Sequence, residues 1–324
     1  MRAMNGYATV IGTVFIDCKG FPFQTYIPTG RNLGRIQFVH GGVGRNIAEN
    51  LGLMGVPTQL VSSVDNTGLG LEVLQRLNQS GVRTEQIAKA DQEGMGMWMA
   101  ILDERGDLAG SISQMPNLSA MAGHFASYGE AIVSGSSHIM LELDLNAELS
   151  TAVLELAEKH NKPVYGIPGN LDVILQKPEL LSKLACFICN HVEAERLLGR
   201  SFIELSENER LDTIRELAHA LGLPQLVITL GQHGSVYYDG TVGASGEVGV
   251  QAVYPVTVED SSGAGDAYFS GTVMGLMRGL PLRQAVVCGT KVAGWTIESP
   301  ENNCKTLFDQ LSGDAVIRAL PLSV

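Results

Sequence analysis

Short apolar runs alternate with segments of helical periodicity along most of this chain, and this order constrains the fold more than any other feature. Runs such as 59–64 and 226–230 have the length and composition of buried strands. Between such runs, apolar residues recur at helical spacing, as in Leu211, Ile214 and Leu217. Strands that alternate with helices form a largely parallel sheet covered on both faces. We therefore expect an α/β protein with three layers, α/β/α, around a mostly parallel central sheet.

The expected elements follow one another from residue 7 to the C-terminal part of the chain. Strands are predicted at 7–17, 59–64, 138–143, 163–167, 186–190 and 226–230. Helices are predicted after Gly44, at 69–79, about 147–160, near 171–183, from His191, at 211–221 and in the C-terminal part. Ser206 with Glu209 makes a capping box for the helix at 211–221.

Two segments do not fit the alternation. Residues 94–113 have the pattern of two strands joined by a turn at 103–107. Residues 21–40 are irregular, with prolines and several glycines, and end in a short apolar piece at 36–39. We interpret about 18–40 and 94–113 as a small β lid. Because no linker, repeat or shift in composition marks a boundary, we expect a single domain over 1–324.

Composition excludes several classes of function. With 22 Lys+Arg against 34 Asp+Glu the formal net charge is −12, which argues against nucleic-acid binding, because cationic side chains supply most of that affinity. No apolar run approaches the roughly 20 residues of a membrane span, and no signal-peptide pattern is present. Cys186 and Cys189 stand three apart in a predicted strand and so should point to opposite faces, as core thiols. We expect a cytoplasmic protein with no membrane segment.

The sequence Asp260-Ser-Ser-Gly-Ala-Gly-Asp266 precedes an apolar helix pattern and is the sharpest local signal. Small residues let the backbone approach a ligand, and the free N–H groups and dipole of a helix N-terminus favour negative charge. The alternative is an ordinary tight turn with an acidic first-turn residue. Because two aspartates bracket the small residues where a helix begins, we favour a site for a phosphate or for transition-state charge.

A second glycine-rich cluster, GGVGRN at 41–46, opens the helix after the first strands. It matches neither the dinucleotide fingerprint nor the P-loop. Gly42 and Gly44 would allow backbone contact with a ligand, and Asn46 can donate and accept. The glycines are equally compatible with a simple turn, so both interpretations stay open here.

Polar residues follow the ends of several predicted strands, where open α/β sheets bind ligands. Residues 229–234 (TLGQHG) follow one strand, and Asn190 with Glu193 follows another. The oxygens of these two side chains lie on one face of a helical turn and suit Mg²⁺, often through water; capping is the alternative. Further strand-end acids are Asp17, Glu142 and Asp144. Trp98 and its neighbouring methionines favour packing within the lid over stacking on a base.

Taken together and in this order, these features resemble the ribokinase-like, or PfkB, carbohydrate kinase family over nearly the whole chain. The resemblance rests on Asp17, GGVGRN at 41–46, the lid hairpin, NHVE at 190–193, TLGQHG at 229–234 and DSSGAGD at 260–266. It implies the ribokinase-like fold and transfer of the ATP γ-phosphoryl group to a primary hydroxyl of a sugar or nucleoside. ATP and Mg²⁺ are the implied cofactors, and a small molecule is the implied partner.

The resemblance also implies a role for each motif residue. Asp266 matches the general base, and the backbone of Gly263, Ala264 and Gly265 matches the anion hole. Asn190 and Glu193 match the residues that organise Mg²⁺ through water. Thr229, Gly231 and Gly234, with Asn190, match the ATP side of the site. Contacts to the sugar hydroxyls are implied for Asp17, Gly42, Asn46 and one or other of Glu142 and Asp144, and K⁺ binding for Asp260 and Ser262.

Details within the motifs indicate the acceptor. The segments 16–20, 41–51 and 99–108 look most like those of members that phosphorylate pseudouridine at its 5′-hydroxyl. Val43 and Arg45 stand where ribokinases usually carry Lys and Ala, and His40 replaces a smaller residue. The alternatives are a kinase of ribose, fructose or adenosine, and a catalytically silent ligand sensor. Lids of this family often pair across a dimer, so we also expect a homodimer formed through the lid.

Overall fold

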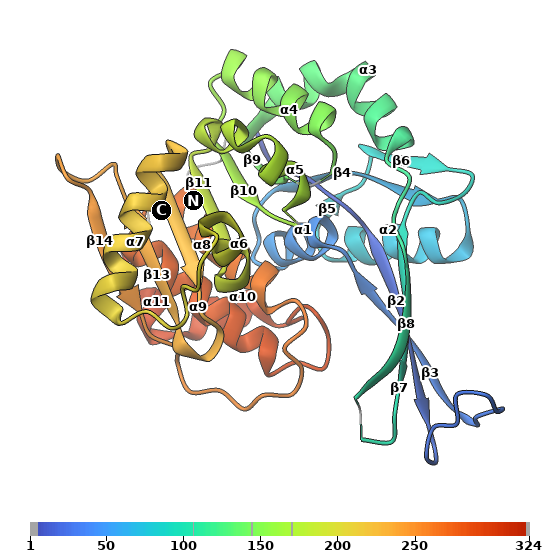
Figure 1. Cartoon of the computed structure of the whole chain (residues 1–324). Coiled ribbons are helices and arrows are strands. Elements are labelled where there is room, and N and C mark those ends of the chain that lie inside the picture. The colour runs from blue at the N-terminus through green and yellow to red at the C-terminus, as the bar shows by residue number, and fades with distance from the viewer. Residues whose placement is uncertain (1–5, 106, 144, 170, 322–324) are drawn as a thin grey trace.

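The computed structural model describes residues 6–105, 107–143, 145–169 and 171–321, which form two sheets and the helices around the larger one (Figure 1). The larger sheet is ten-stranded. In order across the sheet, its strands are β14 (Glu247–Gln251), β13 (Ser235–Asp239), β12 (Gln225–Thr229), β11 (Cys186–Asn190), β10 (Val164–Ile167), β9 (Ser136–Glu142), β1 (Tyr7–Ile11), β4 (Thr58–Asp65) and β5 (Val82–Arg83), with β6 (Ile87–Ala90) also on β4. All pairings are parallel except those that β13 makes with β12 and β14.

Helices cover both faces of this sheet and divide its core in two. One face packs against α1 (Val43–Leu53), α2 (Gly68–Gln79), α8 (Ala264–Met277), α9 (Leu282–Ile297), α10 (Leu307–Gly313) and α11 (Ala315–Arg318). The other packs against α3 (Ser119–Gly135), α4 (Ala147–Lys159), α5 (Asp172–Gln176), α6 (His191–Leu198) and α7 (Glu207–Leu221). The predicted three-layer α/β/α arrangement is confirmed.

Strand β11 shows how alternating side chains feed the two cores. Cys186 and Ile188 belong to the core under α8 and α9, whereas Phe187 and Cys189 belong to the opposite one. Both cysteines are free thiols, and burial raises the pKa of each. The prediction that they point to opposite faces is therefore confirmed.

The smaller sheet is the lid. It is built from β2 (Phe15–Pro22), β3 (Gly34–Gly41), β7 (Gly96–Leu102) and β8 (Leu108–Gln114), in the order β3-β2-β7-β8. The central pair β2–β7 is parallel, and the two outer pairings are antiparallel. Figure 1 shows these strands extending from the helix-covered body as an arm. The predicted β lid is confirmed, although β3 is a full strand where the sequence indicated an irregular segment.

The predicted strand 7–17 is wrong, because the chain changes sheets inside it. β1 ends at Ile11 and β2 begins at Phe15. The break lies where Gly12 crosses Gly44 so closely that a Cβ on Gly44 would lie 2.5 Å from the Cα of Gly12. No L side chain fits between the two backbones, so both positions need glycine for close approach. As a result Asp17 belongs to the lid, not to the central sheet.

Three helices also differ from the sequence prediction. The segment 171–183 divides into α5 and a 3₁₀ helix, η1 (Pro178–Lys183), because a proline cannot donate to the preceding turn. Helix α3 was not predicted, and its N-cap residue Leu118 makes no side-chain capping bond. Helix α7 begins at Glu207 rather than at 211, and its N-cap Ser206 forms the predicted capping box with Glu209. Within the described residues, no helix has the length and apolar character needed to cross a membrane.

Candidate active site

The candidate site lies where parallel strands of the central sheet end. β9 ends at Glu142, β11 at Asn190 and β12 at Thr229. Because these strands run parallel, their C-terminal ends share one edge of the sheet. A hollow of about 550 Å³ at this edge is lined by Asn190, Glu193, Thr229, Gly265 and Asp266, among others. The structure thus brings together residues from three separate sequence motifs.

The turn before α8 has the geometry of an anion site. Gly263 is the N-cap of α8 and has φ +76°, a left-handed conformation that favours glycine. A Cβ on Gly263 would also lie 2.4 Å from the carbonyl oxygen of Asn302. A Cβ added to Gly265 would meet no atom within 4 Å, so the space beside this residue is open. The first N–H groups of a helix have no partner within it, so the start of α8 can present donors to the hollow. The N–H of Ala264 makes a long bond, 3.3 Å, to the carbonyl oxygen of Ser261.

Asp266 stands in the first turn of α8 and has an unusual carboxyl group. Burial raises its pKa to about 7, the Asn46 amide and Arg45 act to lower it, and the charges of Glu142 and Glu193 act to raise it. The Nδ2 group of Asn46 donates to Oδ2 of Asp266 at 2.7 Å. A carboxylate with a pKa near neutrality is suited to take a proton from a substrate near pH 7.

The glycine-rich cluster at 41–46 includes Asn46, and Asp17 contacts it from a different element. Asn46 is in the first turn of α1, whereas Asp17 is on β2 of the lid. The Asp17 carboxylate lies over Gly41, where an added Cβ would come within 3.2–3.3 Å of its oxygens. Burial raises the pKa of Asp17, and Lys19 and Arg45 act against this. The cluster at 41–46 therefore connects the body, through Asn46 on α1, with Asp17 of the lid.

The glycines of this cluster also have a purely structural reason. Gly42 has φ +96°, and a Cβ there would lie 2.6 Å from the carbonyl oxygen of Thr13. Gly44 crosses Gly12 as described above. The turn interpretation thus has a physical basis, and contact of Gly42 with a ligand stays a prediction.

Glu142 has a partner that sequence reasoning missed. The backbone N–H of Thr13 donates to Oε2 of Glu142 at 2.7 Å, and the Thr13 hydroxyl donates to the same oxygen at 3.0 Å. Glu142 therefore holds the segment that joins β1 to β2. In the sequence, Thr13 is visible only as a polar residue next to Gly12 within an apolar run. Asp144, the other predicted contact, lies outside the described residues.

Asn190 and Glu193 form a capping box at the start of α6. The N–H of Asn190 donates to Oε2 of Glu193 at 2.7 Å, and the N–H of Glu193 donates to Oδ1 of Asn190 at 2.9 Å. Within the part of the chain that the structure describes, no group of three or more His, Cys, Asp or Glu could hold a metal ion. A Mg²⁺ ion here would therefore take most of its ligands from phosphate and water, as this ion commonly does.

The other predicted cation site has a local hydrogen bond of its own. Oδ1 of Asp260 accepts from the N–H of Ser262 at 2.8 Å, which is a common turn geometry. This bond shapes the entry to the turn at 260–266, and K⁺ binding by Asp260 and Ser262 stays a prediction.

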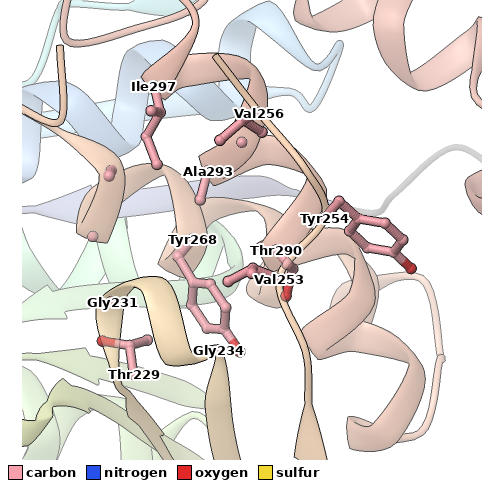
Figure 2. A pocket seen from close by; sticks show the side chains of 13 residues that line it. Thr229, Gly231, Gly234, Val253, Tyr254, Val256, Tyr268, Thr290, Ala293 and Ile297 are labelled. Atoms are coloured by element: carbon pink, nitrogen blue, oxygen red, sulfur yellow. The ribbon is translucent and has the colours of Figure 1, made fainter. Parts of the chain in front are cut away.

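An apolar hollow of about 630 Å³ adjoins the first one (Figure 2). Thr229 and Gly265 line both hollows. Figure 2 shows Val256, Ala293 and Ile297 grouped on one side, with Thr229 and Gly231 at the other end. The mostly apolar lining suits a small, largely apolar ring system. The sequence did not indicate these apolar residues, because nothing in their spacing separates them from core positions.

Comparison with known proteins places these features in a family. Residues 5–305 match the pfkB family carbohydrate kinase model. A guanosine-inosine kinase from Exiguobacterium acetylicum is 34% identical over 299 residues, covering 92% of this chain and 96% of that protein. A pseudouridine kinase from Escherichia coli (strain K12) is 31% identical over 281 residues, covering 86% and 87%. A ribokinase from Arabidopsis thaliana, solved with ribose and ATP, superposes with a TM-score of 0.80 at 18% identity over 96% of this chain and 100% of that one.

Proposed function

Because this chain belongs to the pfkB family of carbohydrate kinases, we propose that it transfers the γ-phosphoryl group of ATP to the 5′-hydroxyl of a nucleoside. One observation carries the proposal. Asp266, a carboxylate with a pKa raised to about 7, stands in the first turn of α8 and lines a hollow that shares Thr229 and Gly265 with the apolar one. A base and an anion site side by side are what phosphoryl transfer to an alcohol requires.

The apolar hollow is the proposed site of ATP. Its apolar walls at Val253, Val256, Ala293 and Ile297 suit an adenine ring. Thr229, which also lines the hollow that contains Asp266, and the glycines Gly231 and Gly234 are the proposed contacts of the phosphates. Mg²⁺ bound to those phosphates would neutralise their charge, with Asn190 and Glu193 holding its water ligands. Asp260 and Ser262 are the proposed residues for K⁺.

The proposed reaction balances through one proton transfer. Asp266 takes the proton of the acceptor hydroxyl as that oxygen bonds to the γ-phosphorus. The bond from the γ-phosphorus to the β,γ-bridging oxygen breaks, and ADP leaves with the electron pair. The N–H groups of Gly263, Ala264 and Gly265 stabilise the charge on the transferring phosphoryl oxygens. The products are the nucleoside 5′-phosphate and ADP.

The acceptor is proposed to lie between the body and the lid. Asp17, Gly42 and Asn46, together with Glu142, are the proposed contacts to the ribose hydroxyls. Trp98 on β7 pairs in register with Asp17 on β2, so both side chains lie on the same face of the lid. The sequence alone favours packing of Trp98 within the lid, but its register with Asp17 places the ring on the face of the proposed ribose contact. An aromatic ring there favours an acceptor with a planar base over a free sugar.

Two bases are candidates. Pseudouridine is our first choice, because the motif segments resemble its kinases and the Escherichia coli pseudouridine kinase is 31% identical. Guanosine and inosine are the second candidates, because the Exiguobacterium acetylicum relative is 34% identical over more of the chain. A silent sensor is disfavoured, since the base and the anion turn are both present.

We also propose that two copies pair through their lids. Phe38, Met99 and Ile112 share one side of the lid sheet by register, opposite to the face of Asp17. Phe38 is 55% and Ile112 68% exposed. A second copy would bury this apolar side.

The test is a coupled assay of ADP release with purified protein, ATP and Mg²⁺. Pseudouridine, guanosine, inosine, uridine, adenosine, ribose and fructose are compared by kcat/KM. We expect a nucleoside to lead the series, with pseudouridine first. A lead for guanosine or inosine would support the proposed reaction and show that the acceptor carries a purine rather than the base of pseudouridine. A lead for ribose or fructose would overturn the nucleoside proposal, and no ADP release with any acceptor would overturn the kinase itself.

A further inference from the structure

We propose that Arg45 is a positioning residue, which aims the side-chain amide of Asn46 at Asp266 and so sets the orientation of the base. Arg45 stands beside Asn46 in the sequence and is 1% exposed, which is rare for an arginine. Its Nη1 donates to Oδ1 of Asn46 at 2.6 Å and to the carbonyl oxygen of His40 at 2.9 Å. The proposal rests on the proposed function, in which Asp266 is the base.

The amide of Asn46 has one accepting and one donating end, and the two ends face different partners. Oδ1 accepts from Arg45, and Nδ2 donates to Oδ2 of Asp266 at 2.7 Å. With the amide turned over, its NH₂ group would meet the guanidinium and its oxygen would meet the carboxylate. Both contacts are repulsive, so Arg45 admits only the orientation that places a donor on Asp266.

Arg45 is itself held by charges on three segments. Glu49, one turn along α1, pairs with it in the buried interior. Arg76 on α2 bonds Oε1 of Glu49 at 2.9 Å and Oε2 of Glu301 at 2.5 Å. A buried arginine with a hydrogen-bonded counter-charge has one geometry available, and removal of either partner is costly. The network therefore fixes the guanidinium that fixes the amide.

The segment after α9 connects this network to the anion turn. Nδ2 of Asn303 donates to the carbonyl oxygen of Asn46 at 3.0 Å, and Nδ2 of Asn302 donates to that of His40 at 3.2 Å. The carbonyl oxygen of Asn302 packs against Gly263, where an added Cβ would lie 2.4 Å from it. The N-terminal ends of α1 and α8, which carry Asn46 and Asp266, thus rest on the same short segment.

The charges around Asp266 give the same residue a second effect on the base. Glu142 from β9 and Glu193 from α6 face Asp266 with negative charge, and Arg45 from α1 faces it with positive charge. Loss of Arg45 would remove the positive charge and release the Asn46 donor. Both changes favour the protonated carboxyl group, which cannot accept a proton.

The decisive experiment is a double-mutant cycle of Arg45→Met and Asn46→Ala, measured as kcat with the best acceptor. We expect Arg45→Met alone to lower kcat about 10–100-fold, the scale of a misaimed catalytic group, with KM for ATP little changed. In the Asn46→Ala background the same substitution should change kcat less than about twofold, because residues that act as one unit are not additive. Full multiplication of the two losses would overturn the proposal.

Two further readouts separate positioning from a loss of folding. The acid limb of the kcat profile should move to higher pH in Arg45→Met, and Arg45→Lys should restore part of kcat; an unmoved limb would count against the proposal. Arg210→Met is the matched control, since that arginine also donates to backbone carbonyls, far from the site, and should keep wild-type kcat. If Arg45→Met does not fold, Arg45→Met/Glu49→Gln removes both buried charges and takes its place in the cycle.

A readout without turnover keeps this inference separate from the proposed function. The side-chain amide signal of Asn46 in a ¹H–¹⁵N spectrum is the one that disappears in Asn46→Ala. We expect it to follow pH through the titration of Asp266, to stop doing so in Asp266→Asn, and to move to the position of a free asparagine amide in Arg45→Met. An Asn46 signal unchanged by Arg45→Met would overturn the relay even if no acceptor were ever phosphorylated.

Discussion

The ten-stranded sheet buries both of its alternating sets of side chains, whereas the lid sheet leaves one apolar set uncovered. In the body, helices seal each face, and the two cores share no side chains across β11. In the lid, Phe38, Met99 and Ile112 lie on one exposed side. A strand buried on both faces has its register fixed by packing, while a half-covered strand depends on what else contacts it.

The proposed site divides along the same line. Asp266, Asn46 and the turn at 260–266 belong to the body, where each is tied to a second element. Asp17 and Trp98 belong to the lid. The comparison therefore predicts that changes in the body alter chemistry or folding, and that changes in the lid alter acceptor binding and assembly.

The largest effect should come from Asp266→Asn. Loss of a general base costs about 10²–10⁴-fold in kcat, while the affinity for ATP should be kept, because the proposed ATP site is the apolar hollow and not Asp266. In the wild type, kcat/KM should fall as pH falls through about 7, because the base is then protonated. Steady-state assays from pH 5.5 to 9 measure kcat and kcat/KM, and a nucleotide titration measures the affinity for ATP. Near-wild-type kcat in this variant would remove Asp266 from its assigned role.

On the lid, Trp98→Ala should raise KM for the nucleoside by about 10-fold or more. Stacking of a base on an aromatic ring is worth about 1–3 kcal/mol, and truncation removes it. The control is Met99→Ala, which changes the opposite side of the same strand and should leave KM unchanged. Steady-state kinetics at saturating ATP make the measurement. Equal KM values for the two variants would mean that the indole packs within the lid and does not meet the base.

A pair of glycine substitutions compares the two regions directly. Gly263→Ala places a side chain at φ +76° and 2.4 Å from a backbone oxygen, so we expect a loss of at least about 1–3 kcal/mol in the free energy of unfolding. A Cβ added to Gly110 on β8 would meet nothing within 4 Å, so Gly110→Ala should change the free energy of unfolding by less than about 0.5 kcal/mol. Urea denaturation gives both values. A similar loss at both positions would contradict the distinction between body and lid.

The smallest effect on chemistry should follow from Ile112→Lys. A charge on the uncovered side of the lid should separate the proposed dimer, while kcat changes by less than about threefold. Light scattering after size-exclusion chromatography reports the mass. Ser111→Lys, on the other side of β8, is the control and should leave assembly intact. A monomeric wild type would disprove pairing of the lids.

Local signals in the sequence predicted much of this fold. The capping boxes at Asn190 and Ser206 need only residues three apart, and the opposite faces of Cys186 and Cys189 follow from strand periodicity. Helix α3 escaped notice because three glycines dilute its pattern and its N-cap residue is Leu118, which makes no capping bond. The break between β1 and β2 depends on the crossing of Gly12 with Gly44, a contact that no local window contains.

For the candidate site too, only the residues with a local signal could be named from the sequence. DSSGAGD marks a helix start by its own composition, so Asp266 and the turn could be found. The bond from Asn46 to Asp266 joins residues 220 positions apart, and the bond from Thr13 to Glu142 joins residues 129 apart. The role proposed for Arg45 depends on its burial, which the sequence does not predict, because a charged residue in a polar motif is usually exposed.

The passage of the chain from β1 into β2 at Gly12 has a consequence for water. Beyond that crossing the chain enters the lid with Asp17, whereas Asn46 and Asp266 stand together in the body. The proposed base is therefore in place without substrate, while part of the proposed nucleoside site is carried by the other sheet. A poised base next to bound ATP would hydrolyse it if a water molecule sat where the hydroxyl belongs. In the proposed site a nucleoside contacts both Asp17 and Asp266, whereas a single water molecule beside Asp266 has no contact with the lid. We therefore expect the division of the site between two sheets to favour transfer to a nucleoside over hydrolysis of ATP.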